Sequence, residues 1–395
     1  MDWKTEALGD IAFMTSGGTP SKKHPEYYEN GTIPWVRSGE LENGAIRDTE
    51  LKITQAGLDN SSAKIFPKGT LLIALYGATI GKLAYLDIEA CTNQAVCGIF
   101  ENKKVSLQYL YYFLLLHRPD LVKQGIGGAQ PNISQTILKK LMVSYPADKT
   151  EQLRIVARIE ELFSQLDKGV ETLQKTKQQL AVYRQAVLKQ AFTSASGWVR
   201  KAASEIGEVN LGRQRSPKNV SNHYPTKYIR AANITEQGLD LDDVLDMEFT
   251  PAEREKYYLR AGDIIVSEAS GSATQVGKPA IWKNEILNCC FQNTVIRHRI
   301  HTEHPEYVFW YYKYLYESGY FSKIVGGVGI NHLGAKNFAN IMINIAPYDE
   351  QMEIVEQIES KVSVCDDIEK AVENAIQQAE AMRQSILKQA FEGGL

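Results

Sequence analysis

The sequence predicts an α+β protein in which two similar globular domains are each followed by a long helix. Three observations support this prediction. The segment 151–192 returns at 350–391 without a gap, and both copies begin Glu-Gln-x-x-Ile-Val and end Leu-Lys-Gln-Ala-Phe. Weaker matches link the segments that precede the two copies. Both helical copies also carry apolar residues at alternating steps of three and four, which is typical of a coiled coil.

The first globular domain is predicted at 1–148, and the second at 196–347. They correspond through short matches at slightly varying offsets. In each, a glycine turn leads into an apolar strand, at 69–73 and again at 262–266. Aromatic-rich stretches at 109–117 and 307–316 have helical spacing, which favours buried packing over base stacking. Strands with one or two helices make each domain α+β.

The central long helix is predicted at 149–195, and the C-terminal long helix at 348–395. In the first, the seam consists of Ile159, Phe163, Leu166, Val170, Leu173, Lys177, Leu180, Arg184, Val187 and Ala191. In the second, it consists of Ile358, Val362, Cys365, Glu369, Val372, Ile376, Ala379, Arg383, Ile386 and Ala390. A helix with such a stripe needs a partner, and the other copy is the nearest one. Parallel pairing would require the intervening domain to span the whole helix length. We therefore expect an antiparallel coiled coil and a pseudo-twofold axis.

Polar residues near the two helix ends are identical in both copies, although packing does not require it. They are candidates for a contact with a partner protein that is made twice. The alternative, recent duplication without divergence, stays open. The residues are Arg184, Gln185, Lys189 and Gln190, with Arg383, Gln384, Lys388 and Gln389 in the second copy.

Composition excludes several classes of protein. No apolar run is long enough for a membrane helix, and the first residues do not resemble a signal peptide. The five cysteines lack the spacing of a disulfide framework, which fits a reducing cytoplasm. The net charge of −3 argues against gripping nucleic acid by bulk charge, but it leaves room for a local basic cleft.

No motif predicts catalysis, a cofactor or a metal. The chain has no Pro-Pro pair, which the catalytic segment of an adenine methyltransferase needs, and Gly77 to Lys82 is one residue short of a phosphate-binding loop. Cys289 and Cys290 with His298, His301 and His304 lack the usual spacing of zinc ligands. We expect neither a metal site nor catalytic residues.

Five motifs stand in a fixed order along the chain: GGTPSKKHPEYYENGTIPWVRSGEL, KGTLLIALYGATIGKLAYL, TNQAVCGI, GGAQPNISQTILKKLMVSYP and the helices ending LKQAF. With this order repeated, the chain resembles the specificity (S) subunit of a Type I restriction–modification system over essentially its whole length. The resemblance implies two target recognition domains, each reading one half of a split, asymmetric site in double-stranded DNA. It also implies that the coiled coil sets the half-site spacing and docks two methyltransferase subunits, that restriction/translocase subunits join, and that the chain itself is not an enzyme.

Residues that read DNA should be polar, lie in loops and present paired donors and acceptors. Basic candidates for phosphate or guanine are Lys22, Lys23, Arg37, Lys82, Arg213, Arg215, Lys218, Arg230 and Lys278. Amide candidates for adenine are Gln94, Gln130, Asn132, Gln275, Asn293 and Asn331, for which turn or capping roles are the alternative. Divergent loops add Tyr76, Thr79, Ser270 and Ser272.

A residue kept at the same place in both domains is poorly suited to distinguish two half-sites. We therefore expect Arg37/Arg230, Lys82/Lys278 and Asn132/Asn331 to serve the scaffold or a phosphate contact. Specificity is expected where the copies diverge, at 21–28 against 216–224 and at 76–80 against 270–276. Two other functions are alternatives. A duplicated protein–protein interaction scaffold is the runner-up, and a self-contained enzyme is disfavoured by the missing motifs.

Overall fold

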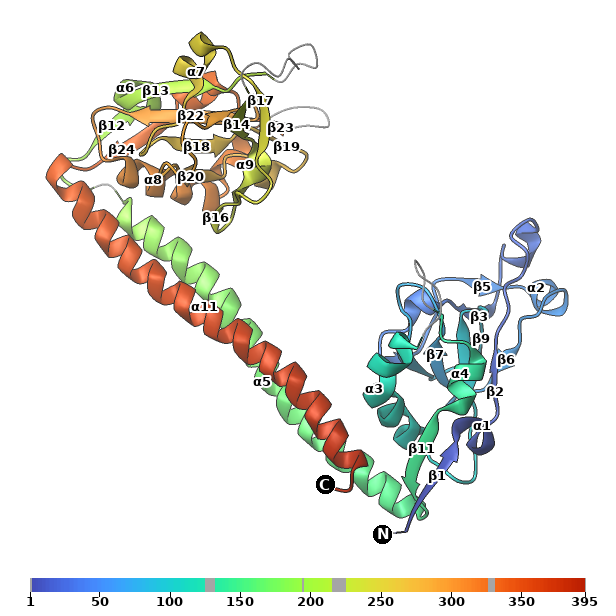
Figure 1. Ribbon diagram of the computed structural model, residues 1–395. Helices are drawn as coiled ribbons and strands as arrows, with labels where there is room; N and C mark the ends of the chain where they lie inside the picture. The colour runs from blue at the N-terminus through green and yellow to red at the C-terminus, as the bar shows by residue number, and fades with distance from the viewer. Residues whose placement is uncertain (1, 125–131, 194, 215–224, 326–330, 395) are drawn as a thin grey trace. The chain divides into compact units, whose positions relative to one another are not determined.

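The computed structural model describes residues 2–124, 132–193, 195–214, 225–325 and 331–394. They pack as two units (Figure 1). Unit 1 contains Met1–Leu173 and Asn374–Leu395, and unit 2 contains Gln174–Glu373. Each unit therefore combines one globular domain with part of each long helix. No helix in the described ranges is both long and apolar enough to cross a membrane.

Unit 1 is built around a five-stranded sheet with the order β2-β10-β7-β8-β4. Its strands are β2 (Met14–Ser16), β10 (Val96–Ile99), β7 (Leu71–Ala74), β8 (Leu83–Leu86) and β4 (Gly44–Ile46). A four-stranded sheet has the order β5 (Lys52–Ile53), β3 (Ile33–Val36), β9 (Ala90–Thr92) and β6 (Ile65–Phe66). β1 (Trp3–Ala7) pairs with β11 (Met142–Pro146). The helices are α1 (Leu8–Ile11), α2 (Gln55–Asp59), α3 (Leu107–Lys123) and α4 (Gln135–Lys140), with 3₁₀ turns η1 (Pro25–Tyr27) and η2 (Ser38–Glu40).

Unit 2 repeats the central strands in a four-stranded sheet with the order β13-β22-β18-β20. These are β13 (Gly207–Leu211), β22 (Val295–Ile300), β18 (Ile264–Ser267) and β20 (Pro279–Ile281). A second sheet contains β17 (Leu245–Glu248), β14 (Pro225–Ile229) and β21 (Cys290–Phe291). Three pairs are β12 (Val199–Ala202) with β24 (Met342–Ile345), β15 (Ile234–Thr235) with β16 (Gly238–Leu239), and β19 (Ala269–Ser270) with β23 (Asn331–His332). The helices are α6 (Ala203–Ile206), α7 (Pro251–Tyr257), α8 (Pro305–Glu317), α9 (Tyr320–Ile324) and α10 (Ala335–Ala339), with 3₁₀ turns η4 (Ala231–Asn233) and η5 (Ala273–Gln275).

The aromatic helices pack against the central sheets, as predicted. In unit 1, Tyr109 and Phe113 of α3 are buried in the core with the strand residues Leu71 and Ile99. In unit 2, α8 contributes Tyr307, Tyr311 and Tyr312 to the equivalent core. Most of these aromatic side chains are therefore committed to packing and are not free to stack on bases.

The long helices are α5 (Lys149–Ala191) and α11 (Tyr348–Phe391). In unit 1, Arg383 of α11 pairs with Asp167 of α5 and lies over the ring of Phe163. In unit 2, the Lys177 ammonium lies 2.6 Å from the Glu373 carboxylate, and Arg184 lies 2.9 Å from Glu369. Residue numbers rise on one helix as they fall on the other, which confirms the antiparallel coiled coil.

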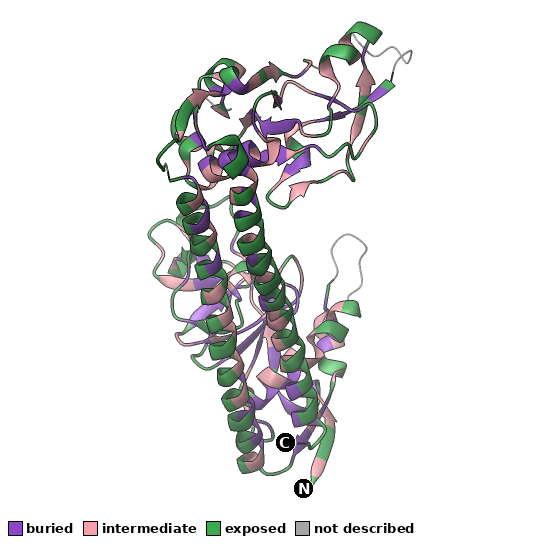
Figure 2. Ribbon diagram, turned by 90° about the vertical axis from the view of Figure 1, so that its left-hand side faces the viewer, coloured by how far each residue is buried: buried purple, intermediate pink, exposed green. Residues whose placement is uncertain are grey.

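The predicted seam is confirmed with one exception. Every seam residue named for α11 is buried or half-buried, and so are those of α5 except Lys177. Lys177 is exposed, while its neighbour Thr176 is half-buried, because the ammonium reaches outward to two carboxylates on α11. Figure 2 shows the exposed outer faces of both helices.

The repeated helix-start motif has a structural cause. The side chain of Gln152 is fully buried, donates to the carbonyls of Lys104 and Pro146 and accepts from the backbone of Ser106. Gln351 does the same in unit 2, where it donates to Glu303 and Ala346 and accepts from His304. These bonds connect the start of each long helix to its own domain. Breaking them would be costly, because it would leave a buried amide unpaired.

Candidate nucleic-acid interface

The divergent loops are closed by the same backbone frame in both units. In unit 1, Ala74 donates to the Lys82 carbonyl and accepts from the Gly81 N–H. In unit 2, Ser267 makes the equivalent bonds with Lys278 and Gly277. The loops are 75–80 and 268–276, so the second is longer within an unchanged frame. This combination allows two different loop surfaces to be presented by one scaffold.

The repeated arginines are held by acidic partners. Arg37 pairs with Glu50, and its backbone N–H donates to Glu40 at the start of η2. Arg230 pairs with Asp243, and its N–H donates to Asn233 at the start of η4. The two arginines thus have matching surroundings, which supports the scaffold alternative for this pair.

Gly17 and Gly212 occupy equivalent positions in the two units, and both positions require glycine for a steric reason. A Cβ on Gly17 would lie 2.0 Å from the Thr92 carbonyl oxygen, and one on Gly212 would lie 2.3 Å from that of Gln292. The residue that follows Gly212 is Arg213, whose side chain turns inward to Glu253 at 2.7 Å. Arg213 therefore stabilises α7 and is not free to bind phosphate in this conformation.

The pairing of Asn132 with Asn331 is one residue out of step with the backbone. Ile133 donates to the Leu75 carbonyl, and the equivalent bond in unit 2 runs from Leu333 to Glu268. Asn132, which bridges to Tyr76, therefore corresponds to His332 and not to Asn331. His332 places its Nδ1 3.1 Å from the buried Glu268 carboxylate. Asn331 matches Asn132 in residue type alone, because the offset between equivalent residues is 200 here, as Ile133 and Leu333 show, and not 199.

Three predicted residues of unit 2, Ser270, Gln275 and Lys278, meet around one hollow of about 550 Å³. The β15–β16 hairpin contributes Glu236 and Gln237 to its wall, and sequence reasoning missed both. Their only signal was a Glu-Gln-Gly turn between two short apolar runs. The hollow therefore joins the divergent loop to a second exposed turn.

Inside this hollow, Lys278 is buried and its ammonium lies 2.5 Å from Gln275 Oε1 and 3.5 Å from Glu236. In unit 1 the matching Lys82 is half-exposed, and the described residues provide no partner for its ammonium. The two repeated lysines thus have different surroundings, and only Lys82 is placed to reach a phosphate.

The remaining candidates fall into three groups. Thr79 donates to the Ser38 carbonyl at 2.8 Å, and Gln94 accepts from Thr19. Lys22, Lys23 and Ser272 are exposed and Asn293 is half-exposed, so these four remain available to a ligand. Gln130, Arg215 and Lys218 lie outside the described residues.

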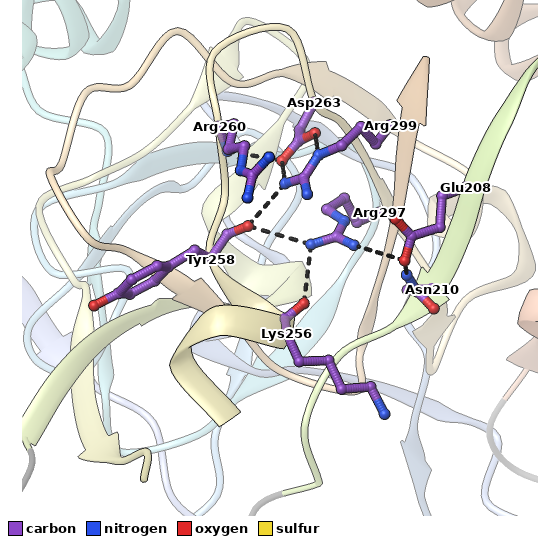
Figure 3. Close-up of polar contacts among 8 residues, drawn as sticks. All are labelled: Glu208, Asn210, Lys256, Tyr258, Arg260, Asp263, Arg297 and Arg299. Carbon is purple, nitrogen blue, oxygen red and sulfur yellow. Dashed lines mark hydrogen bonds and ion pairs between the residues drawn. The ribbon is translucent and has the colours of Figure 1, made fainter. Parts of the chain in front are cut away.

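An ionic network that the sequence analysis did not predict lies on β22 (Figure 3). Arg297 donates to the carbonyls of Lys256 and Tyr258 and pairs with Glu208 at 3.4 Å. The Arg299 guanidinium donates to both oxygens of the Asp263 carboxylate, each at 2.7 Å. Burial lowers the pKa of the Arg297 guanidinium. The network fixes the segment after α7 to the sheet, so we assign it to the scaffold.

The cysteine–histidine group is divided between different environments. Cys289 and Cys290 belong to different apolar clusters, and burial raises the pKa of each thiol to about 12. His298 is buried on β22 and its Nδ1 lies 2.8 Å from the Tyr312 hydroxyl. Thiols that stay protonated are poor metal ligands, because the thiolate is the form that binds.

The repeated helix ends combine packing with exposure. Phe391 packs against Tyr109 and Phe113 in unit 1, and Phe192 packs against Tyr307 and Tyr311 in unit 2. Of the docking candidates, Arg184 and Arg383 make ion pairs between the helices, and Gln185 donates to the Glu317 carbonyl. The exposed candidates are Lys189, Gln190, Gln384, Lys388 and Gln389.

Comparison with known proteins agrees with this architecture. The family model described as "Type I restriction modification DNA specificity domain" matches residues 1–181 and again 195–378. The chain is 25% identical to the StySPI specificity subunit of Salmonella potsdam and 23% identical to the EcoKI specificity subunit of Escherichia coli strain K12. Both matches cover 100% of this chain and 89% of the relative.

Solved structures share the fold. A chain from a study of complex assembly and conformational transition in the type I R-M system has a TM-score of 0.81 at 18% identity, covering 100% of this chain and 98% of that one. The HsdS subunit from Thermoanaerobacter tengcongensis has a TM-score of 0.57 at 18% identity, covering 100% and 97%. With two matching domains and this fold, the chain belongs to the family of Type I restriction–modification specificity subunits.

Proposed function

We propose that this chain is the non-catalytic subunit that selects the DNA site of a Type I restriction–modification complex. Each globular domain reads one half of a bipartite, asymmetric sequence in double-stranded DNA. The observation that carries this proposal is the pair of divergent loops held by one duplicated frame. An unchanged frame gives both domains the same approach to DNA, while different loops read different bases.

The coiled coil is the part that we assign to spacing and docking. Its antiparallel seam gives the helix pair a fixed length of about 1.5 Å per residue. The exposed Lys189, Gln190, Lys388 and Gln389 are the proposed contacts for two methyltransferase subunits, one near each helix end. Restriction/translocase subunits join the complete complex. Adenine methylation belongs to those partners and not to this chain.

The test is a genome-wide map of N6-methyladenine in host cells with and without the gene. We expect methylation at one split motif with a constant gap to disappear when the gene is deleted. Restoring the gene on a plasmid provides the control, because it should restore the same motif. An unchanged map, together with co-purification of partners other than methyltransferase subunits, would favour the interaction scaffold.

Shortening both helices tests the spacing role. Residues 168–174 lie opposite 376–382 in the register set by the Asp167–Arg383 pair. Removing both heptads preserves the seam and shortens the coil by about 10 Å, which corresponds to about three base pairs of duplex. We expect a shorter gap between unchanged half-sites in the methylation map. Lys168→Ala, which keeps the length, should leave the gap unchanged, and altered half-sites with the original gap would contradict the proposal.

A further inference from the structure

The loop that carries Gln275 is fixed by its neighbours. The Ser267 hydroxyl donates to the Gln275 carbonyl at 2.8 Å and accepts from the Lys278 N–H at 3.0 Å. Gly277 has a φ of +85°, and a Cβ there would lie 2.2 Å from the Phe321 ring. The backbone beneath Gln275 is therefore held in one position, as a residue that reads bases requires.

Lys278 fixes the orientation of the Gln275 amide. Its ammonium, which can only donate hydrogen bonds, lies 2.5 Å from the end of the Gln275 side chain. The atom that faces it must accept, so it is the carbonyl oxygen Oε1 and not the nitrogen. Glu236 holds the ammonium from another side at 3.5 Å and itself accepts from the Tyr316 hydroxyl at 2.8 Å.

The carbonyl oxygen of Gln275 is thus turned toward Lys278, and its amino group is the part of the side chain left to donate to a ligand. Its Nε2 carries two N–H groups, for which the described residues supply no acceptor, and the residue is exposed on the wall of the hollow. A free glutamine would offer both a donor and an acceptor, which is the pattern that matches adenine. Gln275 does not present that pattern as a pair, because its oxygen is directed to the Lys278 ammonium while its amino group stays unbonded within the described part of the chain.

We infer that Gln275, oriented by Lys278, selects guanine at one position of the half-site read by the second domain. This inference rests on the proposed function. Guanine presents two acceptors, N7 and O6, on its major-groove edge, while cytosine presents a donor and adenine pairs its N7 acceptor with an amino group. The positive charge behind the amide further favours an edge made of acceptors. Gln275 is a specificity-determining residue, and Lys278 is its positioning residue.

The first domain lacks this arrangement. Thr79 stands in the place of Gln275, two residues before the loop glycine, and its hydroxyl donates to the Ser38 carbonyl at 2.8 Å. The matching Lys82 therefore has no amide to orient. Any change in base preference caused by Gln275 variants should appear in one half-site only.

The experiment uses the full chain assembled with its methyltransferase subunits and duplexes in which every base of the wild-type site is varied in turn. In Gln275→Glu, one carboxylate oxygen still accepts from Lys278 and the other becomes an acceptor toward DNA. We expect the preference for guanine over adenine or cytosine at one position to fall by roughly ten- to a hundredfold. In Lys278→Met the amide is released, and adenine should be accepted at that position.

Gln237→Glu is the matched control, because it adds the same charge to the wall of the same hollow. It should leave base preference unchanged. A guanine preference that survives Gln275→Glu, or an identical shift in both carboxylate variants, would overturn the inference and leave the proposed function intact. A wild-type complex that discriminates between no sequences would overturn both. Gln275 is exposed, so its variant should fold even if Lys278→Met does not.

Discussion

The two units fill the same position of their central sheets with opposite chemistry. In unit 1 the position on β10 is Gly98, where a Cβ would lie 2.8 Å from the Phe66 ring, and that ring packs on Phe100. In unit 2 the matching residue on β22 is Arg297, and the residue two further along is Arg299. An edge-to-face aromatic pair in unit 1 is replaced by an ionic network in unit 2, and the strand register is unchanged.

This exchange shows what the duplicated scaffold requires. Dense filling of the space is needed, but the filling can be apolar or charged if the charged groups are paired. Asp263, at the position of Thr70, provides the carboxylate that Arg299 needs. Divergence between the domains has therefore reached the interior, and it is not confined to the loops.

Substitution of the buried Arg297 should produce the largest difference in stability between the two units. Arg297→Met keeps the approximate length of the side chain but removes its donor from the Lys256 carbonyl and leaves Glu208 with Asn210 as its remaining donor among the described residues. We expect the free energy of unfolding of unit 2 to fall by about 3 kcal/mol or more. Hydrogen exchange followed by mass spectrometry would show a loss of protection of about a hundredfold or more in β18 and β22.

The control for that measurement is Arg47→Met in unit 1. Arg47 is exposed and pairs with Asp87 at 3.3 Å, so its loss should cost less than about 1 kcal/mol. Equal effects of the two substitutions would mean that the network contributes nothing beyond a surface ion pair.

Lowering the pH should produce a smaller difference in stability between the two units. Burial lowers the pKa of His298 to about 4, and the matching residue in unit 1 is Ile99, which does not titrate. The neutral imidazole is favoured in the folded state, so its contribution is present above pH 6.5 and is lost as the pH falls toward 4. We expect unit 2 to lose about 2–3 kcal/mol between pH 7 and 4.5 from this group.

Urea unfolding at pH 7, 5.5 and 4.5, monitored separately in each unit by hydrogen exchange, checks this expectation. His298→Gln retains a polar partner for the Tyr312 hydroxyl and does not titrate, so it should reduce the difference between the units. If that variant shows the same acid sensitivity as the wild type, other groups cause it.

The smallest difference lies in the two seam arginines. Arg184 contacts two carboxylates, Asp366 and Glu369, whereas Arg383 contacts Asp167 and lies 4.9 Å from the centre of the Phe163 ring. Each substitution to alanine should cost at most about 1 kcal/mol. In thermal unfolding at 1 M salt, the cost of Arg184→Ala should nearly vanish, while that of Arg383→Ala should persist in part, because packing on a ring is less screened. Equal salt sensitivity would contradict this.

Features with a local period were predictable from the sequence. The seam and the buried aromatic helices follow from apolar spacing. The antiparallel pairing follows from chain connectivity, because parallel helices would require the intervening domain to span the whole helix length. The exception at Lys177 arose because a long side chain can leave the seam to reach a carboxylate on the partner helix. Arg37 and Arg230 were matched by sequence position, and each has an acidic partner in the structure.

Contacts between distant residues were not predictable. The Arg299–Asp263 pair joins strands 36 residues apart and leaves no periodic signal. His332 was missed because the offset between equivalent residues is 200 at this point, and the neighbouring Asn331 matches Asn132 at an offset of 199. Gln275 was predicted to lie in the divergent loop. The orientation of its amide depends on Lys278, only three residues away, and the loop backbone brings these two side chains together.

The antiparallel helices also affect how the chain is made. The core of unit 1 includes Ile386, Leu387, Ala390 and Phe391, which lie at the end of the chain. The first globular domain is therefore synthesised long before these α11 residues, which complete its core. At about 5–20 residues per second, the roughly 240 residues from the end of the first domain to the end of α11 take about 12–50 seconds to translate. During that interval Tyr109 and Phe113 lack their contact with Phe391 and are accessible to chaperones or to a neighbouring nascent chain. The core of the first domain is therefore completed only after the second domain has been synthesised.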